Sequence, residues 1–223
     1  MNTRYLILLF IAVIAGLSAC KNNDNVFPTV VNTTINVVNA SADTLNFFLN
    51  GTRQNNASNL FPLGSTLYLT VPAGAQNYQF KKADGFNVLF SVPLTLSGVN
   101  NSLYVAGESA ADTFSTRDTL TYDSGYTSVR FVNAAPNAGN LNVFVGDTVN
   151  FKSRAFKSSS VFLTTGSGLK EVKIYLAGAT TAAIDTIIAM EPNSGYTLFA
   201  KGQLNGKGNA AFDVGVVTNF LNQ

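Results

Sequence analysis

Hydrophobic and polar residues alternate with a period of two along most of this chain, and the alternation predicts short β-strands. In the segment 129–148, apolar residues occupy every second position from Leu141 to Val145. Asn142 and Phe144 lie between them, on the other face of the predicted strand. Successive side chains of a strand point to opposite faces, so the Leu141–Val145 set is expected in a core.

The same pair of strands occurs earlier, in residues 35–52, where Asn46 and Phe48 match Asn142 and Phe144 in chemistry and phase. The later strands follow in the same order, at an offset of roughly 95 residues, which suits a whole repeated domain rather than a solenoid unit. We therefore interpret the chain as a tandem repeat. Asn50-Gly51 adds a strong hairpin signal, because both residues tolerate positive φ.

Each repeat contains several short strands separated by turn residues, and no segment after the first twenty residues has helical apolar spacing. This pattern predicts an all-β chain of two tandem antiparallel β-sandwich domains, immunoglobulin- or transthyretin-like. The predicted domains span 34–123 and 127–223. The connection is short, so we expect the sandwiches to touch end to end or with a slight bend.

Phe48 and Phe144 lie on strand faces that should otherwise be polar. One interpretation places them under a loop or a second sheet. The other places them at a domain or partner interface.

The N-terminus has the features of a targeting segment. Arg4 precedes an apolar run that is too short to span a bilayer comfortably, and the run ends in Leu17-Ser18-Ala19-Cys20. This ending resembles a bacterial lipobox, which predicts a signal peptide at 1–19, lipid attachment at Cys20 and a flexible tether over 20–33. An ordinary secretory peptide is the alternative.

Acyl chains on Cys20 would hold the protein stably on a membrane. Lys21 follows, instead of the Asp that favours inner-membrane retention in enteric bacteria. By resemblance, the expected location is the bacterial cell envelope, with a lipid anchor in the outer membrane.

Charge argues against nucleic acid as a partner. Charged residues make up 12% of the chain and the net charge is only +2. The basic residues are scattered, with Lys81-Lys82 the one adjacent pair, and such a pair is typical of a solvated strand end.

Catalytic chemistry has few candidates. The chain has no His, and its one Cys is the predicted lipid site. These facts argue against the usual triads, cysteine nucleophiles and zinc sites. Asp112 and Asp118 are too loosely placed to form a carboxylate pair, and Asp84-Gly85 is better interpreted as a turn than as a calcium loop. We expect no enzyme activity, no metal and no cofactor.

Both strand pairs carry a family resemblance. Residues 129–138 read Val-Arg-Phe-Val-Asn-Ala-Ala-Pro-Asn-Ala, and 196–202 read Tyr-Thr-Leu-Phe-Ala-Lys-Gly. They resemble a bacterial family known as domain of unknown function 4397, which typically begins Val-Arg-Val-Val-His-Ala-Ser-Pro-Asp-Ala-Pro. The resemblance implies a fold and a surface location but no reaction. The family's usual His is Asn133 here and Asn39 in the first copy, where an Asn is expected to bind a neighbouring turn.

A short Asp-Thr-aliphatic pattern occurs four times and is similar to an O-glycosylation acceptor of exported bacterial proteins. The alternative is a simple turn-to-strand transition, since Asp favours turns and Thr favours strands. The candidate acceptors are Thr44, Thr119, Thr148 and Thr186.

These features predict a non-enzymatic surface lipoprotein that serves in binding, adhesion or envelope structure, with envelope proteins or surface glycans as partners. One alternative is a glycan-binding lipoprotein of a polysaccharide uptake system, although the chain has no Trp for sugar stacking. Another is a pilus-type subunit that exchanges a strand with its neighbour.

Overall fold

The computed structural model describes residues 31–98, 100–119 and 124–221. The predicted signal peptide, Cys20 and most of the tether lie outside the described residues. Within the described residues, no helix has the length and apolarity needed to cross a membrane.

The first repeat folds into two four-stranded sheets. One has the order β4-β1-β7-β8 and the other β3-β2-β5-β6. The strands are β1 (Asn32–Asn39), β2 (Leu45–Leu49), β3 (Thr52–Arg53), β4 (Ser65–Pro72), β5 (Gly74–Lys82), β6 (Phe90–Leu96), β7 (Asn101–Val105) and β8 (Thr113–Arg117), with a 3-10 turn η1 (Ala110–Asp112) before β8.

The second repeat has the same plan, with sheet orders β12-β9-β15-β16 and β11-β10-β13-β14. Its strands are β9 (Thr127–Asn133), β10 (Leu141–Val145), β11 (Val149–Arg154), β12 (Leu163–Thr165), β13 (Gly168–Leu176), β14 (Ile184–Met190), β15 (Ser194–Lys201) and β16 (Asp213–Leu221), with η2 (Gly208–Ala210) before β16. The all-β class and the tandem repeat of sandwiches are confirmed.

The sheets differ from the expectation in one respect, because each repeat contains a parallel pair. β1 runs parallel to β7 and β9 runs parallel to β15, while the other pairings between described strands are antiparallel. Hydrophobic alternation shows which face of a strand is buried but not which strand lies beside it, so the sequence pattern could not reveal this pairing. The first two strands occupy opposite sheets, unlike the immunoglobulin order, so the arrangement is transthyretin-like.

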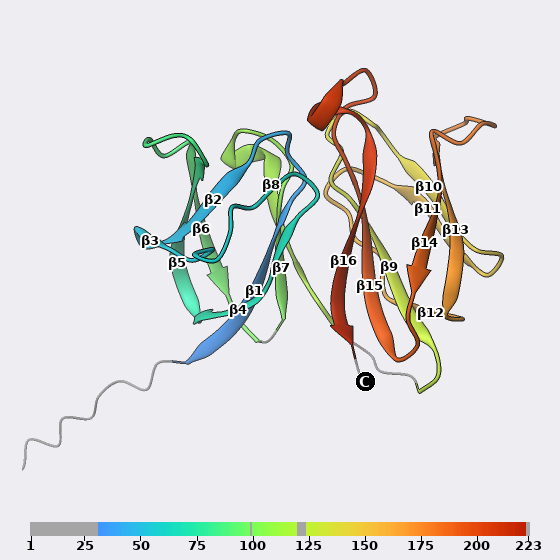
Figure 1. The fold of residues 1–223 in the computed structure, drawn as a ribbon, viewed down its shortest axis with the longest axis horizontal. Helices are drawn as coiled ribbons and strands as arrows, with labels where there is room; N and C mark the ends of the chain where they lie inside the picture. The colour runs from blue at the N-terminus through green and yellow to red at the C-terminus, as the bar shows by residue number, and fades with distance from the viewer. Residues whose placement is uncertain (1–30, 99, 120–123, 222–223) are drawn as a thin grey trace, which may run out of the picture. The chain divides into compact units, whose positions relative to one another are not determined.

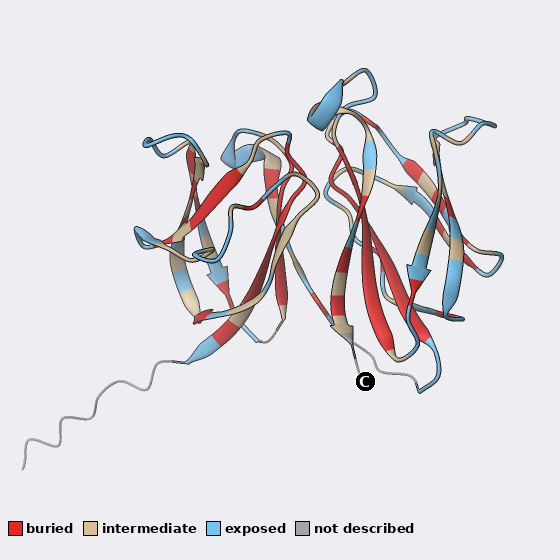
Figure 2. Cartoon of the chain, viewed as in Figure 1, coloured by how far each residue is buried: buried red, intermediate tan, exposed pale blue. Residues whose placement is uncertain are grey.

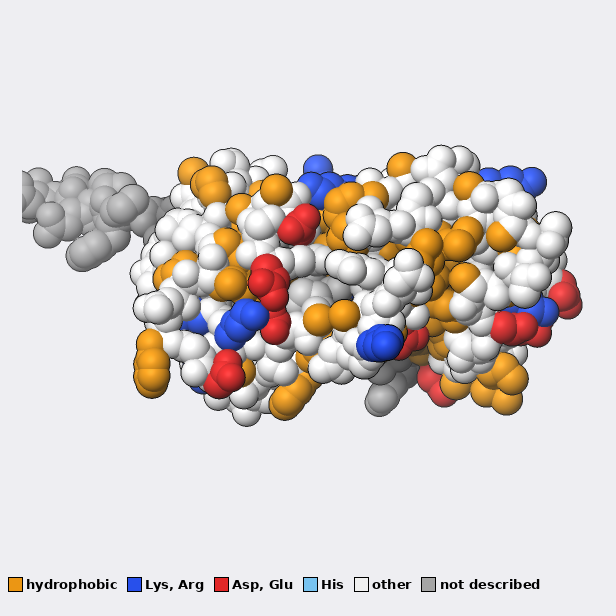
Figure 3. Space-filling model, turned by 90° about the horizontal axis from the view of Figure 1, so that it is seen from above, with side chains coloured by type: hydrophobic (Ala, Val, Ile, Leu, Met, Phe, Trp, Pro, Cys, Tyr) orange, Lys and Arg blue, Asp and Glu red, His pale blue; other side chains and the backbone are white. Residues whose placement is uncertain are grey.

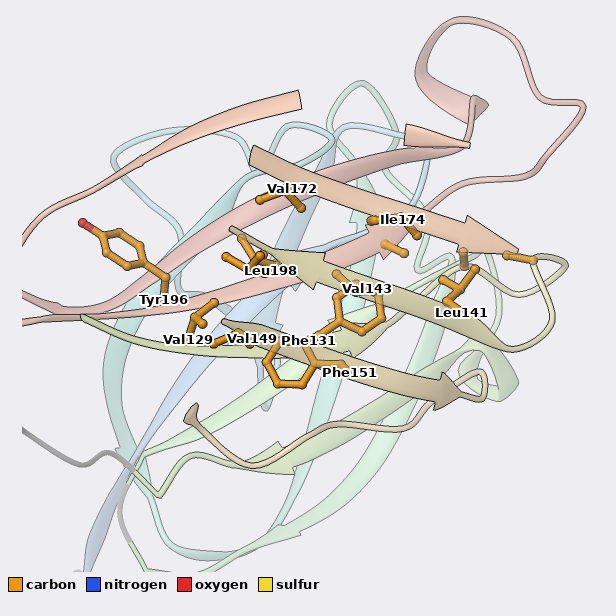
Figure 4. Close-up of a cluster of buried hydrophobic side chains, with 14 of the residues drawn as sticks. Val129, Phe131, Leu141, Val143, Val149, Phe151, Val172, Ile174, Tyr196 and Leu198 are labelled. Atoms are coloured by element: carbon orange, nitrogen blue, oxygen red, sulfur yellow. The ribbon is translucent and has the colours of Figure 1, made fainter. Parts of the chain in front are cut away.

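Each sandwich has its own apolar core. In the second, Leu141, Val143 and Val145 are all fully buried, as predicted. They meet side chains from β9, β11, β13 and β15, which point toward one another in Figure 4. In the first core, Phe47 and Phe80 stack with ring centroids 5.6 Å apart.

The Asn50-Gly51 hairpin is also confirmed. Asn50 has φ 48° and Gly51 φ 83°, and the two residues connect β2 to β3. Positive φ at both central residues gives a turn whose twist matches the flanking strands.

A third apolar cluster lies between the two sandwiches and replaces the expected end-to-end contact with a contact between sheet faces. It contains Val38 and Tyr104 from the first repeat and Val132 and Phe199 from the second. The rings of Tyr104 and Phe199 lie 6.1 Å apart. The central strands β1, β7, β9 and β15 are buried on both faces, which Figure 2 shows in red. Their adjacent apolar residues, such as Val37-Val38, explain why the sheet faces associate.

Strand directions place corresponding loops of both repeats at one end. β1, β5, β7, β9, β13 and β15 all run toward that end, and the loops that follow them gather there (Figure 1). The start of β1 and the end of β16 lie at the opposite end.

Candidate binding face

The outer face of the β11-β10-β13-β14 sheet carries a hollow of about 490 Å³, which we call the β10/β13 face. It is lined by Asn142, Phe144, Gly146, Lys152, Glu171, Lys173, Tyr175 and Ala179. Aromatic, amide and charged side chains meet there on a rigid sheet, a combination typical of ligand sites.

Strand alternation positions these side chains. Val143 in β10 and Ile174 in β13 point into the core, so their neighbours point outward. The antiparallel register sets Asn142 opposite Tyr175, and Phe144 opposite Lys173. The face is therefore a direct consequence of two amphipathic strands lying side by side.

Phe144 and Tyr175 form an edge-to-face pair, with ring centroids 5.6 Å apart and planes at 83°. Phe144 is 39% exposed, so the interpretation that places it under a loop or a second sheet is wrong. Its other interpretation, a place at a partner interface, stays open. The sequence pattern did not single out Tyr175. The signal for it is that Phe144 points outward and that Tyr175 occupies an outward position of another predicted strand.

Three charged side chains on this face pair with one another. Lys173 Nζ lies 2.8 Å from a Glu171 carboxylate oxygen and 3.8 Å from one of Asp185. Hydrogen bonding to Glu171 is the main cause that raises the pKa of Lys173, so this lysine carries its charge at neutral pH. On the adjacent strands, Asn142 Oδ1 accepts a hydrogen bond from the Ser153 amide at 2.8 Å.

The first repeat offers an internal comparison. Phe48 occupies the place of Phe144, but Lys81 stands where the second repeat has Tyr175. Lys81 Nζ lies over the Phe48 ring, 4.8 Å from its centroid. The Lys81 amine thus covers the face of the Phe48 ring in the first repeat, whereas the Phe144 ring lines a hollow in the second.

A second hollow, of about 440 Å³, lies between equivalent loops of the two repeats. Its carboxylates already have partners, since Glu108 pairs with Lys82 and Asp112 accepts from Ser109. Viewed from this end of the molecule, charged side chains form only small separate groups (Figure 3).

Asp118 and Asp112 have different partners: Asp118 forms a buried ion pair with Arg130, and Asp112 accepts a hydrogen bond from Ser109. Among the described residues, no group of three or more His, Cys, Asp or Glu side chains could hold a metal ion.

The Asn residues at the family's His position bind nearby turns, as expected. Asn39 Nδ2 donates to the carbonyls of Asp43 and Leu60, at 2.7 and 2.9 Å. Asn133 Nδ2 donates to those of Gly139 and Arg154, at 3.0 and 2.9 Å. Both side chains are fully buried, so they hold the loop after the first strand of each repeat.

The four candidate glycosylation threonines are dispersed over the fold. Thr119 and Thr148 are exposed, while Thr44 and Thr186 are half-buried. The Asp before three of them has a structural partner: Asp43 pairs with Lys82, Asp118 with Arg130 and Asp185 with Lys173. These ion pairs explain the three Asp residues without glycosylation of the Thr that follows each of them.

Comparison with known proteins identifies the family. A family model described as a domain of unknown function (DUF4397) matches residues 33–144 and 127–222. A search among curated proteins finds none that matches this chain.

One solved structure, titled "Alpha-glucan recognition by family 41 carbohydrate-binding modules from streptococcal virulence factors", aligns over 75% of this chain and 92% of its own, at 14% identity and a TM-score of 0.25. A likeness this weak supports no conclusion about a ligand. The two family matches together cover most of the sequence, so this chain belongs to the DUF4397 family, which it represents in two tandem copies.

Proposed function

We propose that this protein is a non-enzymatic, lipid-anchored module of the bacterial cell envelope that binds a ligand on the β10/β13 face. The single observation that supports this best is the partly exposed Phe144 ring beside Tyr175 in a hollow on a rigid sheet. Clustered aromatic and planar polar groups of this kind are typical of recognition sites.

Anchoring at Cys20 would suit this role. The lipobox-like sequence precedes a short polar tether, and β1 begins at the end opposite the main loops. A flexible tether would leave the β10/β13 face open to partners. The lack of His and the predicted lipidation of the one Cys support a binding role over catalysis.

A carbohydrate is the second, more specific candidate. An exposed aromatic ring can stack on the apolar face of a sugar, while Asn142, Glu171 and Lys173 supply donors and acceptors around it. The absence of Trp does not prevent this, because a Phe ring also presents an apolar platform.

The test is a binding array of glycans and envelope proteins, probed with the chain from Lys21 to Gln223. Phe144→Ala removes the ring at an exposed site, so folding should survive while affinity falls at least about 10-fold. Phe48→Ala is the matched control, because its ring lies under Lys81 in the first repeat. That variant should bind like the wild type.

Equal losses in the two variants would contradict the assignment to the second repeat. Selective binding to one polysaccharide would support the carbohydrate candidate, and selective binding to a protein would exclude it. Hydrolysis of a bound ligand would overturn the non-enzymatic proposal.

A further inference from the structure

The edge strands of the four sheets are unequally protected against pairing with another strand. An edge presents a row of backbone donors and acceptors, and proteins usually shorten, bend or block such strands. Here β3 has two residues and β12 three, and β8 has five. The pairings of β4, β11 and β16 contain register shifts.

Only β6 and β14, of the edges in the described residues, run for seven residues without a register shift. β6 contains Pro93, which is exposed and has no amide hydrogen to donate. Its outward residues Ser91 and Thr95 are polar. The first repeat thus blocks this edge.

The equivalent edge in the second repeat has no such protection. β14 reads Ile-Asp-Thr-Ile-Ile-Ala-Met, without Pro or Gly. Ile187 points outward, opposite Glu171 of β13, and is 66% exposed; Leu169, one pair along on the same face and opposite Ala189, is 75% exposed. Among the described backbone contacts outside the sheets, none reaches residues 184–190 from the side away from β13.

We propose that β14 pairs antiparallel with β14 of a second copy of this chain, about a two-fold axis at Ile187. The two β11-β10-β13-β14 sheets then become one continuous eight-stranded sheet. A two-fold contact of this kind is self-complementary and closes on itself, so it ends as a dimer and does not propagate into a fibre.

Register and charge favour this self-pairing. With Ile187 opposite itself, Asp185 lies opposite Ala189 of the other copy, so the two carboxylates do not meet. On the inner face, Ile184 lies opposite Met190, and Ile188 opposite Thr186. Ile184, Ile188 and Met190 already contact the core of the second sandwich, so the pairing extends an existing apolar layer.

The dimer would place two β10/β13 faces on one sheet. If the proposed ligand site is correct, a polymeric ligand could engage both copies and gain avidity without new contacts. This consequence rests on the proposed function. The pairing itself does not, and the experiment measures it without ligand.

The test is analytical ultracentrifugation of the chain from Lys21 to Gln223, together with two opposed variants. Ile187→Asp places like charges opposite each other at the axis and should raise the dimer dissociation constant at least about 100-fold. Ala189→Lys faces Asp185 of the other copy and should tighten the dimer in low salt, with the gain lost in high salt. Leu169→Asp is the control, since it adds a charge on the same face but away from the edge.

A dimer that is disrupted by Ile187→Asp and preserved by Ala189→Lys and Leu169→Asp would support the proposal. A wild-type chain that stays monomeric at millimolar concentration would overturn it, as would a dimer indifferent to Ile187→Asp. A sugar found on Thr186, which lies in β14, would also contradict free pairing at this edge.

Discussion

Arg130 of β9 is the centre of a buried polar network that involves both repeats. Its guanidinium is almost fully buried, pairs with the buried carboxylate of Asp118 and donates to the Thr197 hydroxyl at 2.8 Å. Asp118 also accepts from Ser102 at 2.6 Å and from Tyr68. Burial opposes the charge on Arg130, but Tyr104 and Asp118 together raise its pKa above the ordinary value. The network therefore joins Asp118, at the end of the first repeat, to β9 and β15 of the second.

Removing only the arginine should be severely destabilising. Arg130→Met leaves a buried carboxylate without its cation, which costs about 3–5 kcal/mol in the free energy of unfolding. Urea denaturation would measure the loss. Arg130→Met combined with Asp118→Asn should recover at least half of it, because no buried charge is left unpaired. Lys207→Met, at an exposed site, should change stability by less than about 0.5 kcal/mol. A similar loss in this control would refute the explanation.

Two buried tyrosines predict sensitivity to alkali. Burial raises the pKa of Tyr78 to about 12, and burial is likewise the main cause that raises the pKa of Tyr104 to about 12. Unfolded tyrosine ionises near 10, so the unfolded state loses its protons first as pH rises. The stability that each tyrosine contributes is complete below pH 10 and is lost between pH 10 and 12, by about 1.4 kcal/mol per pH unit.

Tyr78→Phe isolates this effect, because the Tyr78 hydroxyl is buried and has no hydrogen-bond partner among the described residues. At pH 8 the variant should be unchanged or up to about 1 kcal/mol more stable. At pH 11 it should exceed the wild type by about 1.4 kcal/mol more than it does at pH 8. Urea denaturation at both pH values would measure the difference. Equal losses in the two proteins would contradict the assignment.

At the scale of single strands, the sequence predicts structure best where one face of the strand is apolar. The alternation in β2 and β10 fixed their buried faces, and Asn50-Gly51 located a hairpin. Edge strands are harder to predict: β6 (Phe90–Leu96) contains Pro93, which argues against a strand but is tolerated at an exposed sheet edge. β8 ends at Arg117, and the Asp118 side chain that follows it belongs to the buried polar network.

The β10/β13 face was only partly predictable, for a related reason. Phe144 was identified from its phase, but its surroundings depend on which strand lies beside β10. That pairing joins Lys173 and Tyr175 to Phe144 across 29 and 31 residues of chain, and alternation within one strand contains no information about it. The first repeat has Lys81 where the second has Tyr175. The sequence shows this difference, but only the strand register shows that these residues lie beside Phe48 and Phe144.

At the scale of the whole molecule, the contact between the sandwiches makes the repeats interdependent. Val38, Tyr104, Val132 and Phe199 bury an apolar cluster between them. Asn219 of β16 donates to the Tyr68 hydroxyl of β4 at 2.9 Å, so polar contacts also cross the boundary. A repeat that unfolded alone would expose this cluster and would leave Arg130 or Asp118 without its partner. In tandem sandwiches joined only by a linker, one repeat could unfold without exposing apolar surface or an unpaired charge on the other.

We therefore expect residues 31–223 to unfold in one cooperative transition, with equal calorimetric and van't Hoff enthalpies. Phe199→Ala removes a ring from the contact, which costs about 3–5 kcal/mol, while each sandwich keeps its own core. The variant should show two separated transitions in calorimetry, because the coupling between the repeats is weakened. Phe151→Ala, within the second core, should lower the melting temperature without dividing the transition. Two transitions in the wild-type protein would show instead that the repeats fold independently.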